Sequence, residues 1–196
     1  VEGRDADWVA EDIVLDAAGS SFTVRAPDGQ RQEFRTKLHG VFNVSNTLSA
    51  IAALGEVGYP MAELVPGLAA FDGIEGRVQF VDVDAGFTVV IDAGHKPEAI
   101  NALLVALRPM TAGRIIAVVG SNGNRDAHKR PLMGRFTATA SDIVVVTDDN
   151  PATEDPALIR RAVLAGARST AAEVYEVAGR AEAIHHAVGL ARAGDM

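Results

Sequence analysis

The sequence predicts an α/β protein with a Rossmann-like, mostly parallel sheet, preceded by a smaller region of antiparallel strands and helices. The first observation is a set of short runs rich in β-branched residues, at 87–93, 114–120, 142–148 and 173–177. The second is a set of helical stretches between and after these runs, at about 97–110, 131–140, 155–168 and 180–193. Apolar strands that alternate with helices are typical of a parallel sheet covered on both faces.

Three short strands are expected before this sheet, at 13–15, 21–25 and 32–36. Asp28-Gly29, between the last two strands, is a hairpin signal, because these residues tolerate the positive φ angles of tight turns. The sequence therefore predicts a small antiparallel patch near the start of the chain.

Two helices and a linker are expected to follow this patch. From about Asn43 apolar residues recur at steps of three and four, and the pattern stops near Gly55, as in an amphipathic helix. A second helix is expected at about 61–71, after Pro60. Residues 71–77 carry two glycines and two acidic residues between patterned segments, so they form the predicted domain linker.

Composition excludes several classes of function. The chain has 196 residues, with 18 Lys and Arg against 26 Asp and Glu, a net charge of −8 and no cysteine. The lack of cysteine excludes disulfides, thiol catalysis and Cys-ligated metal sites. Because no cationic run is longer than Lys129-Arg130, nucleic-acid binding is not expected. The sequence has neither an apolar run of about 18 residues nor a signal peptide, so we expect a cytoplasmic protein without a membrane partner.

Polar loops follow three of the predicted strands, at the edge of a parallel sheet where ligands bind. In the first loop, Asp92 could bind ribose hydroxyls, while His95, Lys96 and the start of the next helix could face phosphate. The alternative is a solvated loop in which Asp92 caps that helix.

The second and third loops contain groups that suit a zwitterion. Arg125 could bind a carboxylate through two parallel hydrogen bonds, and the alternative is an ordinary surface arginine. Asp148, Asp149 and Asn150 would suit an ammonium group or a metal ion, although Asn150-Pro151 is also a plain turn signal.

Two further features are less specific. Asn43 and Asn46 lie three residues apart at the start of a predicted helix, where one of them could be an N-cap or both could hydrogen-bond a base edge. Gly120-x-x-Gly123 resembles a phosphate-binding turn, but its spacing matches neither the dinucleotide-binding motif nor the P-loop. These loops alone predict a generic nucleotide- or amino-acid-binding domain.

Six motifs, taken in order and spacing, resemble the Mur ligases of peptidoglycan synthesis, and within them the MurE class. The resemblance covers about residues 40–195, and the combination of Arg-Asp-x-x-Lys-Arg-Pro-x-Met-Gly with Asp-Asp-Asn-Pro is specific to that class. The motifs stand at residues 40–50, 76–77, 92–97, 120–126, 129–134 and 147–151.

The resemblance implies an ATP-dependent amide ligase, using ATP and Mg²⁺, that adds a diamino acid to UDP-MurNAc-L-Ala-D-Glu. The diamino acid would be L-Lys, L-Orn or meso-diaminopimelate. In such enzymes ATP converts the peptide carboxylate to an acyl phosphate, and attack by the incoming amine then expels phosphate. Residues 1–74 would be the C-terminal part of the central ATP-binding domain, and residues 77–196 the C-terminal amino-acid-binding domain without its last elements.

The resemblance also assigns roles to individual residues, none of them a catalytic group or a metal ligand. Asn43 and Asn46 would contact the adenine region of ATP, and Arg77 in the linker its phosphates. Asp92 would bind the ribose, with His95 nearby. The amino and carboxyl groups of the incoming amino acid would be held by Arg125, Asp149 and Asn150.

The chain departs from the family pattern in two loops. The usual Asp-Tyr-Ala-His-Thr-Pro is here Asp-Ala-Gly-His-Lys-Pro at 92–97, which keeps the acid and the histidine but loses the aromatic residue. Ala152 stands where enzymes that select diaminopimelate have an arginine for the distal carboxylate. Because an unpaired buried carboxylate is costly, this change favours L-Lys or L-Orn over diaminopimelate.

The family's P-loop, its modified metal-site lysine and its UDP-sugar-binding domain have no counterpart in the sequence. We therefore expect a C-terminal fragment that is inactive without the N-terminal domains of the same chain. One alternative is another Mur-fold ligase, of the folylpolyglutamate or cyanophycin synthetase type. A second alternative, from a different class, is a non-catalytic module that binds an amino acid or a nucleotide.

Overall fold

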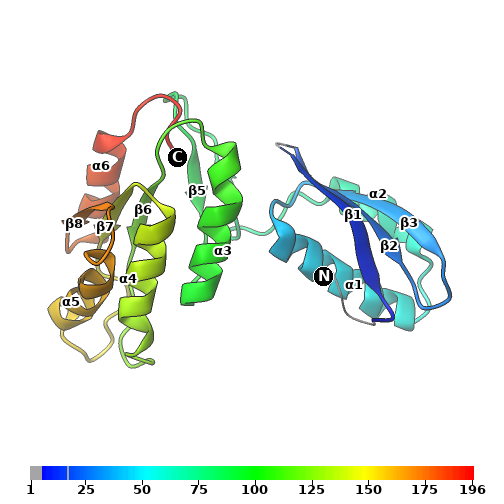
Figure 1. Cartoon of the computed structure of the whole chain (residues 1–196), viewed down its shortest axis with the longest axis horizontal. Helices are drawn as coiled ribbons and strands as arrows, with labels where there is room; N and C mark the ends of the chain where they lie inside the picture. Colours follow the sequence, from blue (N-terminus) through cyan, green and yellow to red (C-terminus); the bar gives the residue numbers. More distant parts are fainter. Residues whose placement is uncertain (1–5, 17) are drawn as a thin grey trace. The chain divides into compact units, whose positions relative to one another are not determined.

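The computed structural model describes residues 6–16 and 18–196, and these form two compact units that meet in sequence at Val78 and Gln79 (Figure 1). The first five residues and Ala17, which belong to the expected first domain, lie outside the described residues. Each unit has its own hydrophobic core, so each is described by itself.

The first unit contains the three expected strands, which form an antiparallel sheet in the order β1-β2-β3. The hairpin between β2 and β3 is confirmed: Gly29 has a φ of 85° and donates a backbone hydrogen bond to Ala26 at 3.0 Å. Phe22 pairs with Phe34 across the hairpin, and both rings are buried. The strands are β1 (Val9–Asp16), β2 (Gly19–Arg25) and β3 (Arg31–Thr36).

Two helices, α1 (Val41–Glu56) and α2 (Met61–Ala70), complete the core of the first unit. The expected N-cap role of Asn43 is wrong, because α1 begins two residues earlier and its N-cap is Gly40. Gly40 has a φ of 91°, which side chains disfavour, so the chain turns into the helix without a side-chain cap. The buried residues of this core are Ala10, Phe22, Val24, Ala26, Phe34, Val44, Ile51 and Met61.

The second unit contains a parallel sheet of three strands in the order β6-β7-β8, as the sequence predicts. The strands are β6 (Ile116–Val119), β7 (Ile143–Val146) and β8 (Glu173–Glu176). The helices are α3 (Pro97–Leu107), which a short 3₁₀ turn extends, α4 (Lys129–Ala140), α5 (Pro156–Ala167) and α6 (Arg180–Leu190). Among the described residues of both units, no helix is long and apolar enough to cross a membrane.

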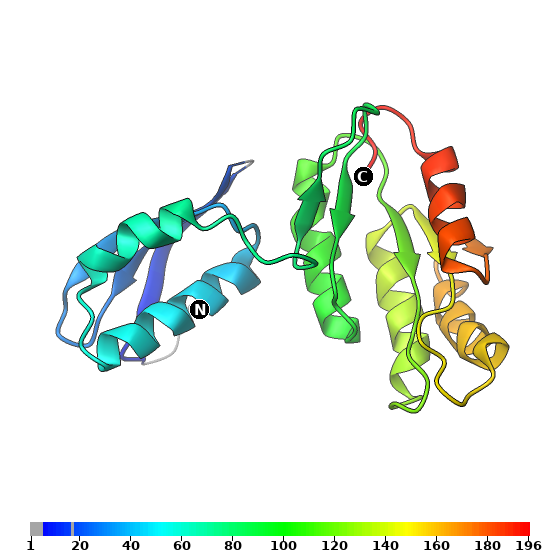
Figure 2. The same ribbon diagram turned by 180° about the vertical axis from the view of Figure 1, so that it is seen from behind.

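Helices cover both faces of this sheet (Figures 1 and 2). Val144 and Val146 of β7 point into a core shared with α3, α4 and α5. Val145, on the other face, packs against Ala183 and Ala187 of α6. All four residues of β7 are at most 2% exposed, and burying one such side chain stabilises the fold by roughly 1.5–3 kcal/mol.

The segment expected as a parallel strand at 87–93 forms a different structure. Only β5 (Val89–Ile91) is a strand, and it pairs antiparallel with β4 (Gln79–Val81), which the sequence reasoning missed. The reason lies near residue 195: the carbonyl of Asp195 accepts from Thr88 N, and that of Met196 accepts from Ile116 N. These backbone groups lie between the two segments, so β5 does not pair with β6.

Helices α4 and α5 approach so closely that glycine is required at the contact. A Cβ atom at Gly134 would overlap the carbonyl oxygen of Val163, and one at Gly166 would overlap that of Pro131. In contrast, a Cβ atom at Gly189 in α6 would meet nothing within 4 Å.

We therefore expect Gly134→Ala to lower the free energy of unfolding by about 1–3 kcal/mol, because the helices must move apart. The matched change Gly189→Ala should raise it by about 0.5–1 kcal/mol, since alanine favours helix over glycine. Urea denaturation of the two variants measures both values. Equal stability of the two variants would contradict the close contact.

A buried ion pair connects residues 192–196 to the start of β6. Asp195 is 4% exposed, and its Oδ2 accepts from Arg114 Nη2 at 2.6 Å. The backbone N–H groups of Arg114 and Arg192 also donate to this carboxylate, at 2.7 and 3.0 Å. The Arg114 side chain, despite a desolvation penalty on the acid, holds the pKa of Asp195 at about 2, below its usual 3.8.

Because this pKa is lowered in the folded state, the stabilisation is present above about pH 4 and is lost as the pH falls toward 2. Asp195→Asn should therefore destabilise the protein by about 1–2 kcal/mol at pH 7, and this difference should shrink below pH 4. Thermal unfolding of both proteins between pH 7 and pH 2 measures it. A difference that stays constant with pH would show that the charge of Asp195 does not contribute.

Candidate functional site

Two loops at the carboxyl ends of neighbouring parallel strands lie against each other. We name them the β6–α4 loop (residues 120–128) and the β7–α5 loop (residues 147–155). Gly123 N donates to the carbonyl of Asn150 at 2.8 Å, and Asn150 N donates to Asn122 Oδ1 at 3.4 Å. A Cβ atom at Gly123 would overlap the carbonyl oxygen of Pro151, so the approach requires glycine. The two loops therefore form one surface.

An ion pair joins the start of α4 to the far end of the β7–α5 loop. Arg130, at the start of α4, donates from Nη1 and Nη2 to the two carboxylate oxygens of Glu154, at 2.9 and 2.8 Å. The backbone N–H of Asn124 donates to Glu154 as well. These donors, with the Arg130 side chain first, lower the pKa of Glu154, so the carboxylate stays ionised.

Arg125 projects from the β6–α4 loop into solvent. Within the described part of the chain, its guanidinium has no hydrogen-bond or ion-pair partner. The preceding residue, Asn124, has a φ of 54°, and its side chain accepts from the Thr153 hydroxyl at 3.0 Å. A free guanidinium on an ordered loop can bind a carboxylate in the bidentate geometry.

The acidic residues of the β7–α5 loop are paired with arginines that the sequence reasoning did not single out. Asp148 and Glu176 both accept from Arg160, and these hydrogen bonds raise the pKa of that guanidinium. Asp149 accepts from Arg180, which is more than half exposed. Asp148 is thus part of a structural ion pair, whereas the partner of Asp149 lies at the surface, where a pair contributes little and a ligand can replace it.

Asn150 uses its side chain within its own loop. Its Oδ1 accepts from Ala152 N at 3.2 Å, which bends the chain so that Ala152 has a φ of 50°. The Asn150 side chain is exposed and keeps its amide donors available to a ligand on the surface shared by the two loops.

The β5–α3 loop (residues 92–96) contradicts one of the two sequence hypotheses, the capping of α3 by Asp92. Asp92 does not cap α3, because its Oδ1 accepts from Gly94 N at 2.7 Å within the loop. His95 is exposed, and its Nδ1 lies 3.3 Å from the carbonyl oxygen of Ala93. Lys129 donates to the carbonyl of His95 at 2.9 Å, so this cation connects the loop to α4.

The remaining candidate residues belong to the first unit. Asn43 and Asn46 lie one turn apart on α1, and Asn46 Nδ2 donates to Asn43 Oδ1 at 3.3 Å. Asn43 Nδ2 in turn donates to the carbonyl of His39 at 2.9 Å. Arg77 is exposed at the end of the unit, and its backbone N–H donates to Ile74. The five residues expected to contact ATP are therefore divided between the two units.

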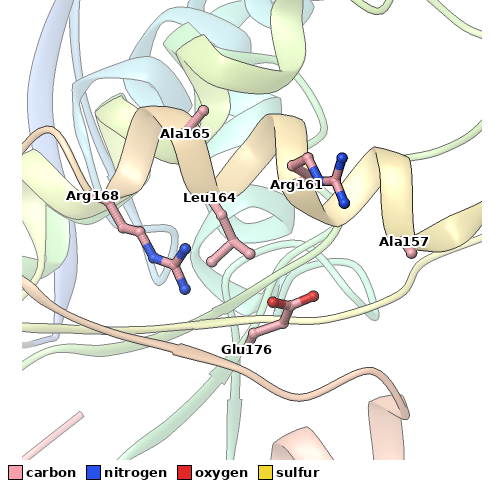
Figure 3. Close-up of a pocket in the computed structure, with 6 residues that line it drawn as sticks. All are labelled: Ala157, Arg161, Leu164, Ala165, Arg168 and Glu176. Carbon is pink, nitrogen blue, oxygen red and sulfur yellow. The ribbon is translucent and has the colours of Figure 1, made fainter.

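No metal centre is found among the described residues, and the cavity described below lies away from the candidate residues. In residues 6–16 and 18–196, no group of three or more His, Asp and Glu side chains could hold a metal ion. A cavity of about 290 Å³ lies along α5, and Figure 3 shows the arginines and the acid that line it. Its lining residues are Ala157, Arg161, Leu164, Ala165, Arg168 and Glu176, none of which is a candidate.

Comparison with known proteins defines the class. A family model described as "Mur ligase, glutamate ligase domain" matches residues 76–196, which is more than half of the chain. The chain belongs to the Mur ligase family. Relatives at about 40% identity are named as a UDP-N-acetylmuramyl-tripeptide synthetase and as ligases of UDP-N-acetylmuramoyl-L-alanyl-D-glutamate and 2,6-diaminopimelate, which are MurE-class names.

Three relatives illustrate the match. A UDP-N-acetylmuramoyl-L-alanyl-D-glutamate--2,6-diaminopimelate ligase of Streptomyces coelicolor is 42% identical over 195 residues, 97% of this chain and 38% of that protein. A UDP-N-acetylmuramyl-tripeptide synthetase of Leifsonia xyli subsp. xyli is 40% identical over 202 residues, which cover 100% of this chain and 39% of that protein. The chain thus spans less than two fifths of the length of these relatives.

The third relative is a solved structure, the folylpolyglutamate synthase of Mycobacterium tuberculosis complexed with ADP. It superposes with a TM-score of 0.78 over 95% of this chain and 41% of that one. At 21% sequence identity, this likeness concerns the fold alone.

Proposed function

We propose that the chain is part of an ATP-dependent amide ligase that adds a diamino acid to UDP-MurNAc-L-Ala-D-Glu in peptidoglycan synthesis. One observation carries the proposal. An unpaired guanidinium, Arg125, and a partly exposed carboxylate, Asp149, whose partner Arg180 lies at the surface, stand on two loops that are hydrogen-bonded to each other. This pair of charges suits the carboxylate and ammonium of an amino acid, and relatives in the MurE class support the reaction.

Each residue of the site has a distinct task in this proposal. Arg125 binds the carboxylate of the incoming amino acid through two parallel hydrogen bonds. Asp149 exchanges the Arg180 guanidinium for the ammonium of the amino acid, and Asn150 donates a neutral hydrogen bond. Together they orient the amine, which lowers the entropic cost of its attack on the activated carboxylate.

ATP supplies the activation of that carboxylate when it is bound, with Mg²⁺ to offset phosphate charge. We propose that the first unit is the C-terminal part of a central ATP-binding domain and the second an amino-acid-binding domain. The exposed Arg77 guanidinium would then contact the phosphates of ATP. Asn43 and Asn46 would contact the adenine region. Asp92 would bind the ribose, with His95 nearby. The proposed location is the cytoplasm.

For the substrate, we propose a diamino acid without a second carboxylate, such as L-Lys or L-Orn. Ala152 carries no charge, and its φ of 50° is a conformation that L-residues with a Cβ atom adopt at a cost of about 1–2 kcal/mol. The site would discriminate against diaminopimelate, because the distal carboxylate of that substrate would lose its hydration at this position without gaining a cationic partner.

Arg125→Met, tested in the full reading frame that contains these residues, should lower kcat/KM for the diamino acid by about 100-fold, because charged hydrogen bonds are lost. The KM for ATP should stay unchanged. Phosphate release with UDP-MurNAc-L-Ala-D-Glu and each diamino acid measures both values. The control is Arg161→Met, an exposed arginine of the α5 cavity, which should have no effect. Phosphate release that depends on L-glutamate instead of a diamino acid would support the folylpolyglutamate alternative. Binding of an amino acid or nucleotide without phosphate release would support a non-catalytic module.

Ala152→Arg should shift the preference toward meso-diaminopimelate by about 10-fold relative to L-Lys, since it adds a cation for the distal carboxylate. Ala152→Met, which adds similar bulk without charge, is the matched control. Competition between the two amino acids at equal concentration gives the ratio of kcat/KM values. An unchanged ratio in Ala152→Arg would contradict the role assigned to this position.

A further inference from the structure

The ion pair between Arg130 and Glu154 has no part in the binding steps described above. Arg130 is 5% exposed, so its guanidinium has been removed from water, and such a charge is costly unless it is well paired. The pair uses both terminal nitrogens of Arg130 and leaves the buried Nε without a partner among the described residues. A buried ion pair with an unsatisfied donor is weak evidence for a role in stability alone.

Glu154 contacts both the backbone of the β6–α4 loop and a side chain from the start of α4. Its Oε1 accepts from the backbone N–H of Asn124, the residue before Arg125, and both of its carboxylate oxygens accept from the Arg130 side chain. Arg130 Nη2 also lies 3.4 Å from the carbonyl oxygen of Asn122. One carboxylate of the β7–α5 loop therefore holds the β6–α4 loop directly at Asn124 and, through Arg130, at Asn122.

Glu154 supports a left-handed backbone conformation at Asn124. Asn124 and Ala152 have φ angles of 54° and 50°, one in each loop. Asparagine adopts this conformation more readily than other non-glycine residues, but still only where surrounding contacts select it over the extended and right-handed regions. Because Asn124 directly precedes Arg125, its backbone angles decide the direction in which the Arg125 side chain leaves the loop.

We propose that Glu154 and Arg130 are positioning residues for the incoming amino acid: their ion pair sets the spacing and direction of Arg125 relative to Asp149. The proposal rests on the proposed function of these two residues as the site for a zwitterion. Neither Glu154 nor Arg130 touches the amino acid, and both act through the loop backbone. A misplacement of about 1 Å in such a site is enough to cost up to about 100-fold in rate.

The test compares Glu154→Gln, Arg130→Gln and the double variant in the full reading frame, with KM measured separately for the diamino acid and ATP. Glu154→Gln keeps an acceptor for Asn124 N and removes the charge. Asp195→Asn is the matched control, because it breaks another buried ion pair of the same unit, at the opposite end of β6. Amide hydrogen exchange of Asn124 reports the loop directly.

We expect KM for the diamino acid to rise about 10- to 100-fold in each single variant, with KM for ATP unchanged. The double variant should match the single ones, since the pair acts as one unit. Asn124 should exchange faster in Glu154→Gln, and Asp195→Asn should lower stability without changing either KM or this exchange.

The proposal is overturned if both KM values change together, if Asp195→Asn gives the same KM shift, or if KM for the diamino acid stays constant. A parent enzyme that releases no phosphate with any diamino acid would refute the proposed function instead. In that case faster exchange of Asn124 in Glu154→Gln would still support the ordering of the loop by Glu154, and unchanged exchange would overturn it.

Discussion

The burial of β7 on both faces is the constraint from which the rest of the second unit follows. Its four apolar residues are at most 2% exposed, so helices must cover both sides and neither face has room for a polar side chain. Polar chemistry can begin only where the strand leaves the core, after Thr147. The candidate amino-acid site therefore lies at the carboxyl edge of the sheet, and loops of neighbouring strands have to supply it together.

Most of the fold could be predicted because its signals are local. Apolar periodicity located the helices of both units to within a few residues, and Asp28-Gly29 located the β2–β3 hairpin. The failure at 87–93 has a different origin. The pairing of β5 depends on backbone groups near residue 195, about a hundred positions away, and no local pattern contains that information. The start of α1 was missed because a glycine backbone angle replaces the expected side-chain cap.

The candidate site was only partly accessible from sequence, for a related reason. Arg125 and Asp149 stand out by residue type and by their place after predicted strands. The residues around them cannot be recognised in the same way, because the ion pairs join residues far apart in the sequence. Arg130 pairs with Glu154 across 24 residues, and Asp149 pairs with Arg180 across 31 residues. Sequence reasoning could name the charges but could not tell an engaged carboxylate, Asp148, from its neighbour at the surface.

The glycine contact between α4 and α5 has a mechanical consequence. At Gly134 and Gly166 backbone touches backbone, so no side chain at this contact can be compressed to let the two helices shift toward each other. The β6–α4 loop ends at one of these helices and the β7–α5 loop at the other. The glycine contact therefore limits how closely the helices that carry the two loops can approach each other.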